Sequence, residues 1–244
     1  MTGTPLAAPV EEGRRVCDAA RDVGVVLRAL GGVAVSLHCS GSASRQLLAD
    51  RQHGDVDLVS SSDAADVVES LFQDLGYEPN WTFNRLHKGE GRVMFFDRRN
   101  ERRVDVFLDR VSMCHELQLA ERLTIDFPTV SLADLLLTKL QVFEITAKDL
   151  IDIEALLIEH PVGHGDEETI DLERVASVCS SDWGWYRTVK GNLQRLITGD
   201  HQRDSSQRAS RLMKHIDEVP KGRRWKLRAR LGERVPWYQL PEDV

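Results

Sequence analysis

The sequence predicts a mixed α/β (α+β) fold, in which a small mixed β-sheet flanked by helices precedes a helical C-terminal region. The first observation is a set of short apolar or alternating runs in the first half of the chain, a pattern typical of strands. The second is the change after Pro128, where apolar residues recur at helical spacing. The third is composition: 244 residues, 41% hydrophobic and 29% charged, supply enough apolar side chains for a buried core.

The first half of the chain alternates between helix-like and strand-like segments. Residues 9–22 predict one helix, and residues 63–75 predict another that Gly76 ends. Residues 33–38 fit either a strand or a helix, and the polar residues 40–54 are expected to form a loop. Strands are expected at residues 25–30, 55–60, 93–96 and 103–108.

The second half predicts helices only. One helix is expected from Ser131 through Phe143 and a second over residues 148–159, after which Pro161 and two glycines form a predicted linker. Three or four helices follow between about residues 171 and 230. The predicted division is therefore an α/β domain at 1–128 and a helical region at 129–244, made of a helix pair at 129–160 and a basic helical tail at 166–244.

Compartment and partners are constrained by what the chain lacks. Its apolar runs are too short to cross a bilayer, so no membrane partner is expected. The N-terminus lacks the basic start and apolar stretch of a secretory signal, so the expected location is cytoplasmic. No CxxC pair occurs, and buried free thiols are expected in place of a zinc or redox site at Cys17, Cys39, Cys114 and Cys179.

Charge is distributed unevenly along the chain. Residues 185–235 contain 14 Lys and Arg against 5 Asp and Glu, a balance of +9, whereas the whole chain has a net charge of −7 and the remainder is therefore −16. A basic module joined to an acidic one indicates a polyanionic partner such as RNA. The alternative is a set of solvated helix faces, some paired with the acidic half.

Asp55 and Asp57 carry the functional argument. On a strand, residues i and i+2 point to the same face, so the two carboxylates are expected to project together while Val56 points into the core. Two parallel carboxylates repel unless a cation lies between them. Magnesium prefers hard oxygen ligands and commonly takes one or two carboxylates together with substrate phosphates. A chance pair of surface aspartates is the competing interpretation.

Asp105 lies in the second alternating run, RVDVFLD, among apolar neighbours. Aspartate is disfavoured in strands, so a compensating interaction is expected. If this strand lies beside the first, Asp105 completes a three-carboxylate cluster that can bind two magnesium ions for a phosphoryl-type displacement, or it accepts a proton from a hydroxyl. The competing interpretation is an edge-strand aspartate that forms an ion pair with Arg103 or Arg110.

Two further features fit a phosphate-binding site. Gly31 and Gly32 follow a predicted strand, and the start of a helix there would offer free N–H groups to an anion. Lys139 lies within an apolar helix face, where an ammonium group needs a partner; triphosphate oxygens are one candidate, and snorkelling past the core is the alternative. Asp149 opens the following helix, and helix capping alone accounts for it.

The ordered combination of these residues resembles the minimal nucleotidyltransferase superfamily, over roughly residues 25–160. It is most similar to the AbiEii-like branch, which includes nucleotidyltransferase toxins of bacterial toxin–antitoxin systems. The matching residues are Gly31, Gly32, Arg51, Asp55, Asp57, Leu135, Lys139, Leu140, Lys148, Asp149 and Asp152. The chain departs from this pattern at His53, where the family usually has Ser, and it offers Gly41-Ser42 as a second candidate for the glycine motif.

The resemblance implies a function. A nucleoside monophosphate would pass from a nucleoside triphosphate (NTP) to an acceptor hydroxyl on an RNA or tRNA end, a protein or a small molecule, and an antitoxin protein is an expected partner. Asp55, Asp57 and Asp105 would be catalytic and bind magnesium, whereas the nucleotide would be bound by Gly31, Gly32, Arg51, Lys139 and Asp149. One alternative is a non-catalytic nucleotide- or partner-binding module on the same fold. Another is a small-molecule nucleotidyltransferase, which would need an acidic acceptor pocket.

Overall fold

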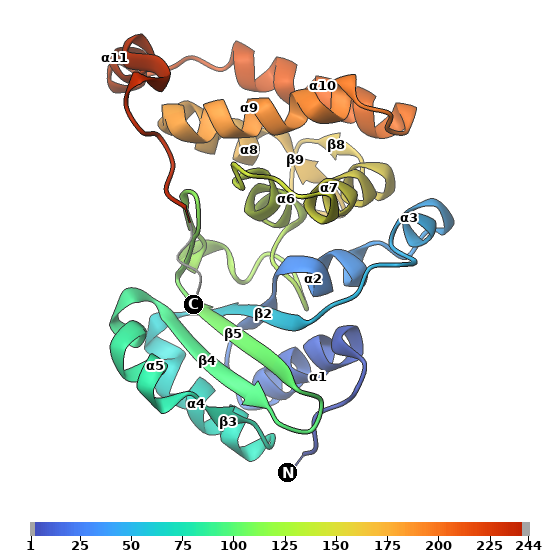
Figure 1. The fold of residues 1–244 in the computed structure, drawn as a ribbon, viewed down its shortest axis with the longest axis vertical. Coiled ribbons are helices and arrows are strands. Elements are labelled where there is room, and N and C mark those ends of the chain that lie inside the picture. The colour runs from blue at the N-terminus through green and yellow to red at the C-terminus, as the bar shows by residue number, and fades with distance from the viewer. Residues whose placement is uncertain (1–2, 241–244) are drawn as a thin grey trace. The chain divides into compact units, whose positions relative to one another are not determined.

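The computed structural model describes residues 3–240, which form two compact units (Figure 1). The sheet unit contains residues 3–38, 51–111 and 118–131. The helical unit contains residues 39–50, 112–117 and 132–240. Residues 39–50 and 112–117, expected in the first domain, thus cluster with the second unit. The mixed α/β class expected from the sequence is confirmed.

A five-stranded mixed sheet forms the centre of the sheet unit, with the order β1-β2-β5-β4-β3. Strands β2 and β5 run parallel, and every other neighbouring pair in this sheet is antiparallel. The strands are β1 (Leu27–Ala29), β2 (Asp55–Ser60), β3 (Glu78–Pro79), β4 (Arg92–Asp97) and β5 (Arg102–Leu108). Because β5 lies beside β2 in the middle of the order, the competing interpretation that placed Asp105 on an edge strand is wrong in that respect.

The pleat gives this sheet one apolar face and one face that carries charged groups. On the apolar face, Val56, Leu58 and Val104 are at most 1% exposed. Helices α1 (Pro9–Asp22) and α4 (Ala65–Asp74) pack there, with Gly13 of α1 close to Val56 and Phe72 of α4 stacked on Phe95. The opposite face, called here the carboxylate face, bears the alternate residues Asp55, Asp57, Arg92, Met94, Phe96, Arg103 and Asp105.

Helix α5 (Trp81–His87) covers the exposed edge of β4 beyond the short β3. Asn84 Oδ1 accepts a hydrogen bond from the backbone N–H of Met94 at 2.7 Å, and the N–H of Asn80 donates to the Met94 carbonyl at 2.9 Å. An unpaired strand edge invites pairing with another chain, so α5 blocks that edge at Met94. The sequence did not predict this helix.

Among residues 3–240, the helical unit contains seven α-helices and two short strands that pair in parallel. These helices are α3 (Ser42–Leu47), α6 (Leu132–Leu140), α7 (Ala147–Glu159), α8 (Leu172–Ser181), α9 (Trp183–Thr198), α10 (Arg203–Glu218) and α11 (Arg223–Leu231). Helix α2 (Gly31–His38) belongs to the sheet unit. The paired strands are β8 (Val162–Gly163) and β9 (Ile170–Asp171), and a separate ribbon pairs β6 (Arg110–Ser112) with β7 (Glu116–Gln118). Turns of 3₁₀-helix occur at Ser62–Ala64, Lys88–Glu90, Ala120–Arg122 and Gly232–Arg234.

Two local expectations differ from the structure. Residues 40–54 are not a continuous loop, because α3 forms within them; Glu159 of α7 accepts hydrogen bonds from Gly41 N–H at 3.0 Å and Ser44 Oγ at 2.5 Å, which fixes this short helix. The predicted linker after α7 begins with β8, paired to β9 within the helical unit. The ambiguous residues 33–38 are helical. Within residues 3–240, every helix is too short or too polar to span a membrane.

Candidate active site

Asp57 and Asp105 lie directly opposite each other on the parallel strands β2 and β5. Asp55 precedes Asp57 by two residues and is paired with Arg103, so three carboxylates share one sheet face, as the alternation predicted. Their environments differ, because Asp55 is exposed, Asp57 is half-buried and Asp105 is fully buried. The shared face is confirmed, and the metal-binding and catalytic roles stay predictions.

Two arginines hold the buried carboxylate of Asp105. Arg92 Nη2 lies 2.8 Å from Oδ1, and Arg103 Nε lies 2.8 Å from Oδ2. A buried charge is costly without such partners, so the ion pairs supply the compensation that the sequence called for. Arg103 was one of the two partners considered from the sequence, whereas Arg92 was not foreseen because it comes from a neighbouring strand.

The glycine pair Gly31-Gly32 begins helix α2 beside Asp57. Gly31 has φ of 61°, a left-handed conformation that favours glycine, and a side chain there would collide with Asp57 Oδ2. A side chain at Gly32 would collide with Arg51 and His53. Four predicted positions, Gly31, Gly32, Arg51 and Asp57, therefore gather in the sheet unit around the start of α2, together with His53, where the chain departs from the family pattern. The His53 ring also contacts Ser36 of α2, with Nε2 2.9 Å from Oγ.

The alternative glycine motif, Gly41-Ser42, has a different environment. The N–H of Gly41 lies 3.0 Å from each oxygen of Glu159, so a carboxylate of the chain itself already binds this helix start. Gly31-Gly32, by contrast, is adjacent to the predicted metal ligand Asp57. Of the two glycine pairs, Gly31-Gly32 is the one beside the carboxylates, and its phosphate-binding role stays a prediction.

Lys139 and Asp149 belong to the helical unit and interact with each other. Lys139 is 9% exposed; its Nζ lies 2.8 Å from Asp152 Oδ2 and 3.5 Å from Asp149 Oδ1. Asp149 also forms a capping box with Thr146 at the start of α7, as its position predicted. The partner that a buried lysine requires is thus a pair of aspartates, and snorkelling to solvent is not what stabilises the ammonium group.

The carboxylate face fits a hard cation in part. Asp55 and Asp57 present oxygen donors from one face of β2, which suits magnesium. Asp105 has both oxygens engaged by arginines, so a cation at that position would have to displace one guanidinium group. Among residues 3–240, no three His, Cys, Asp or Glu side chains are gathered closely enough to hold a metal ion.

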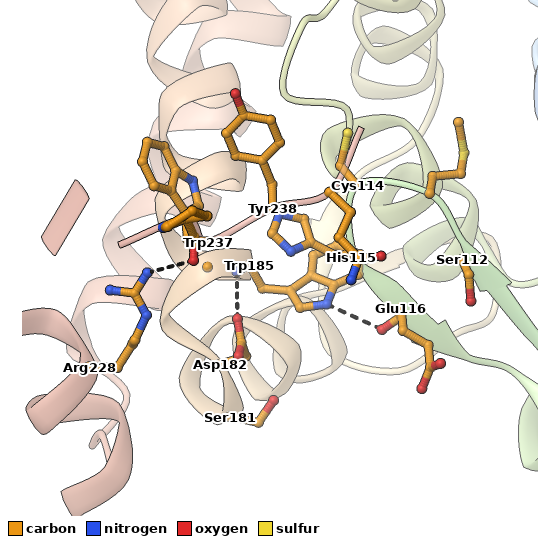
Figure 2. A pocket seen from close by; sticks show the side chains of 14 residues that line it. Ser112, Cys114, His115, Glu116, Ser181, Asp182, Trp185, Arg228, Trp237 and Tyr238 are labelled. Carbon is orange, nitrogen blue, oxygen red and sulfur yellow. Dashed lines mark hydrogen bonds between the residues drawn. The ribbon is translucent and has the colours of Figure 1, made fainter. Parts of the chain in front are cut away.

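A cavity of about 650 Å³ lies in the helical unit, between the residue 112–116 loop, the α8–α9 junction, α11 and the segment 236–239 (Figure 2). Most of its polar groups serve the fold. Asp182 caps α9 by accepting from Trp185 N–H at 2.9 Å, and Arg228 donates to the carbonyls of Gly232 at 2.8 Å and Val235 at 2.7 Å. These groups organise the C-terminal segment, so this cavity is not assigned to the reaction.

His115 forms one wall of the same cavity (Figure 2). Its ring stacks near Trp185 with centroids 5.0 Å apart, and Nε2 lies 2.9 Å from Thr188 Oγ1. Burial lowers the pKa of His115 to about 4, although the nearby charge of Asp182 opposes the shift. The imidazole is therefore neutral at pH 7.

The sequence missed side chains that only tertiary pairing brings to the carboxylate face. Arg92 reaches Asp105 because β4 pairs antiparallel with β5. Trp81 is 62% exposed at the start of α5 and lines a cavity on that face. Asn80, a residue type favoured at helix N-caps, directly before Trp81 was a local signal that could have been used.

The four cysteines are buried free thiols, as expected. Burial raises the pKa of Cys17 and of Cys39 to about 12, so these thiols are protonated at neutral pH.

Comparison of the chain with protein-family models and with curated proteins gave no match in either case.

Proposed function

We propose that the protein is a metal-dependent nucleotidyltransferase with a nucleotidyltransferase fold, which transfers a nucleoside monophosphate from an NTP to an acceptor hydroxyl and releases pyrophosphate. The observation that carries this proposal is the pairing of Asp57 with Asp105 on parallel strands, with Asp55 on the same face and Gly31 against Asp57. Carboxylates beside a glycine turn at a helix start combine a cation site with a phosphate site.

In this proposal, Asp55 and Asp57 hold magnesium, with two ions expected where Asp105 is the third ligand. Magnesium held by these carboxylates would supply charge neutralisation for the triphosphate and polarisation of the reacting phosphate. The backbone at Gly31 and Gly32 binds phosphate oxygens, and Arg51 stabilises the charge that develops on the leaving pyrophosphate. The nucleotide-binding roles of Lys139 and Asp149 rest on the family resemblance alone.

Asp105 has two proposed roles, as metal ligand or as the base that accepts the acceptor's proton. Both require one oxygen to leave an arginine, because Arg92 and Arg103 hold the two oxygens. Arg103 is the easier to release, since its side chain is 38% exposed against 26% for Arg92. Phosphate oxygens are natural new partners for the released guanidinium group.

The proposed acceptor is RNA, such as a tRNA end. On α11, Arg223, Arg224, Lys226 and Arg230 are exposed, and none has an ion-pair partner among residues 3–240. Such a surface attracts a phosphate backbone. A toxin role with a cognate antitoxin is proposed from the resemblance only, and the non-catalytic alternative is separated from an enzyme by the assay below.

The test incubates the protein with each labelled NTP, magnesium and total RNA, and measures which molecule becomes labelled. Transfer of label is expected for the wild type, with loss of at least a hundredfold in Asp57→Asn because one anionic ligand no longer offsets cation dehydration. Asp63→Asn is the matched control, because Asp63 is an exposed aspartate in the 3₁₀ turn that follows β2. Magnesium–NTP affinity that is equal in wild type and Asp57→Asn, measured by calorimetry, rejects the metal site.

A further inference from the structure

A cavity of about 420 Å³ lies on the carboxylate face of the sheet unit. Met94 and Phe96 of β4 form part of its lining, together with Arg103 of β5 and Trp81 of α5. The register pairs Met94 with Asp105 and Phe96 with Arg103, so the floor of the cavity and the carboxylates share one sheet face. The cavity therefore adjoins the proposed reaction site within the same unit.

Arg103 connects the cavity with the buried carboxylate of Asp105. Its Nε lies 2.8 Å from Asp105 Oδ2, and the same side chain lines the cavity. Asp57 lies on β2, and Met94 lies two strands away on β4. Neighbouring strands are about 4.8 Å apart, so the floor of the cavity is about 10 Å from the Asp57 strand. One nucleotide can therefore reach from the carboxylates into the cavity.

The cavity is lined by flat surfaces. The indole of Trp81 is 62% exposed, and the guanidinium of Arg98 lies 4.9 Å from the centroid of the Phe96 ring. Asn80 and Thr82 also line it; the Asn80 side-chain oxygen accepts from Phe83 N–H as the cap of α5, whereas Thr82 is exposed. Aromatic faces and guanidinium planes are the surfaces on which nucleobases stack. The Thr82 hydroxyl suits the hydrogen-bonding edge of a base.

We infer that this cavity receives a nucleobase that stacks on Trp81. The inference rests on the proposed function and adds to it a base-binding subsite. A base stacked there belongs either to the NTP or to the acceptor RNA, since both carry the same ring chemistry. Leu86 of α5 provides a matched control, because it is 63% exposed and does not line the cavity.

The experiment compares wild type with Trp81→Ala, Trp81→Phe and Leu86→Ala. Calorimetry measures the affinity for magnesium–ATP, for magnesium with inorganic tripolyphosphate, and for a single-stranded RNA oligonucleotide. Trp81→Ala is expected to weaken binding of one base-containing ligand about tenfold, by loss of stacking. Trp81→Phe retains most of the affinity because it keeps an aromatic face, and tripolyphosphate binding is unchanged in all variants because it lacks a base.

The outcomes separate the two proposals. Weaker ATP binding in Trp81→Ala assigns the base to the NTP, and weaker RNA binding alone assigns it to the acceptor. If Asp57→Asn abolishes magnesium–ATP binding while Trp81→Ala binds both ligands as wild type does, the base subsite is rejected and the proposed function stands. Equal weakening of tripolyphosphate binding in Trp81→Ala also rejects the subsite, since a general disturbance then explains the loss. Absence of nucleotide and RNA binding to the wild type rejects both proposals.

Discussion

At the scale of single residues, Asp105 illustrates how a charge is kept inside a sheet. It has no exposed surface, and its two oxygens meet Arg92 and Arg103 at 2.8 Å each. Because both arginines are partly exposed, they remain solvated at one end while neutralising the carboxylate at the other. The same arrangement keeps two guanidinium groups on the sheet face that Asp57 shares.

Asp105→Asn is expected to destabilise the protein by about 2–3 kcal/mol, because the charge-assisted hydrogen bond from Arg92 and the ion pair with Arg103 are weakened and two arginines lose their shared anionic partner. Asp55→Asn, a change at an exposed carboxylate on the same face, is expected to alter stability by less than about 0.5 kcal/mol. Urea unfolding of both variants measures the difference. Equal stability of the two variants would show that the arginines do not need Asp105.

His115 predicts a pH dependence of stability. Its pKa in the folded chain is about 4, below the ordinary value of 6.5, because burial disfavours the charged ring. Between these values the unfolded chain binds a proton that the folded chain does not, so stability falls as pH drops from about 6.5 toward 4 and is fully present above 6.5. His115→Phe retains a ring beside Trp185 and should reduce the change of the urea unfolding midpoint with pH over that window. If the midpoint of this variant depends on pH as strongly as that of the wild type, His115 is not the group responsible.

Sequence alternation was sufficient to place Asp55 and Asp57 on one face, because side-chain direction along a strand alternates with position. Asp105 joins them because β5 lies beside β2, which the sequence analysis could only assume. The partners of Asp105 were harder to predict. Arg103 is two residues away on the same strand and was foreseen, but Arg92 depends on the register of β4 against β5. Register is fixed by packing and turn geometry across strands, which a single strand's pattern does not contain.

At the scale of elements, α3 and α5 were missed for a shared physical reason. Both are short, and helices of six or seven residues gain little from intrinsic propensity. Each is held by hydrogen bonds to distant residues, with Glu159 binding the start of α3 and Met94 pairing with α5. The longer helices α1 and α7 were predicted because their apolar spacing spans several turns.

Asn84→Ala is expected to destabilise the sheet unit by about 1–2 kcal/mol, because the backbone N–H of Met94 then loses its acceptor at the edge of β4. Hydrogen exchange of the Met94 amide should accelerate more than that of amides in the central strand β5. Leu86→Ala, on the same helix but exposed, should leave both quantities unchanged. Exchange at Met94 that stays as slow as in the wild type would show that Asn84 is not the protecting group.

At the scale of the whole molecule, positive charge gathers in the helical unit, in the segment 185–235 with its balance of +9. Some of these cations have internal partners: Lys190 pairs with Asp217 at 2.7 Å, and Arg187 with Glu233 at 2.6 Å. Arg208 donates to three carbonyls at the end of α7. The unevenness of charge was evident in composition, whereas the division into internally paired and outward-facing cations required the fold.

Reversal of Arg223 and Arg224 to Glu should weaken RNA binding at low salt and leave NTP binding unchanged, if α11 contacts the phosphate backbone. Each lost phosphate contact lowers the slope of log affinity against log salt by about one. Reversal of Arg14 and Arg21 on α1 is the control, because it changes net charge equally. A drop in melting temperature without a change in RNA affinity would show that these arginines only stabilise the tail.

The parallel pairing of β2 with β5 also determines when the site can exist during biosynthesis. The ribosome makes the chain from its N-terminus, so Asp57 leaves the exit tunnel well before Asp105 does. The segment between them contains α4, β3, α5 and β4, all of which must be synthesised before β5 can dock. A nascent chain that ends before Arg102 therefore carries two of the three carboxylates, Asp55 and Asp57, without the parallel strand β5. The carboxylate face is assembled late, by the strand that completes the sheet, and unfinished chains lack it.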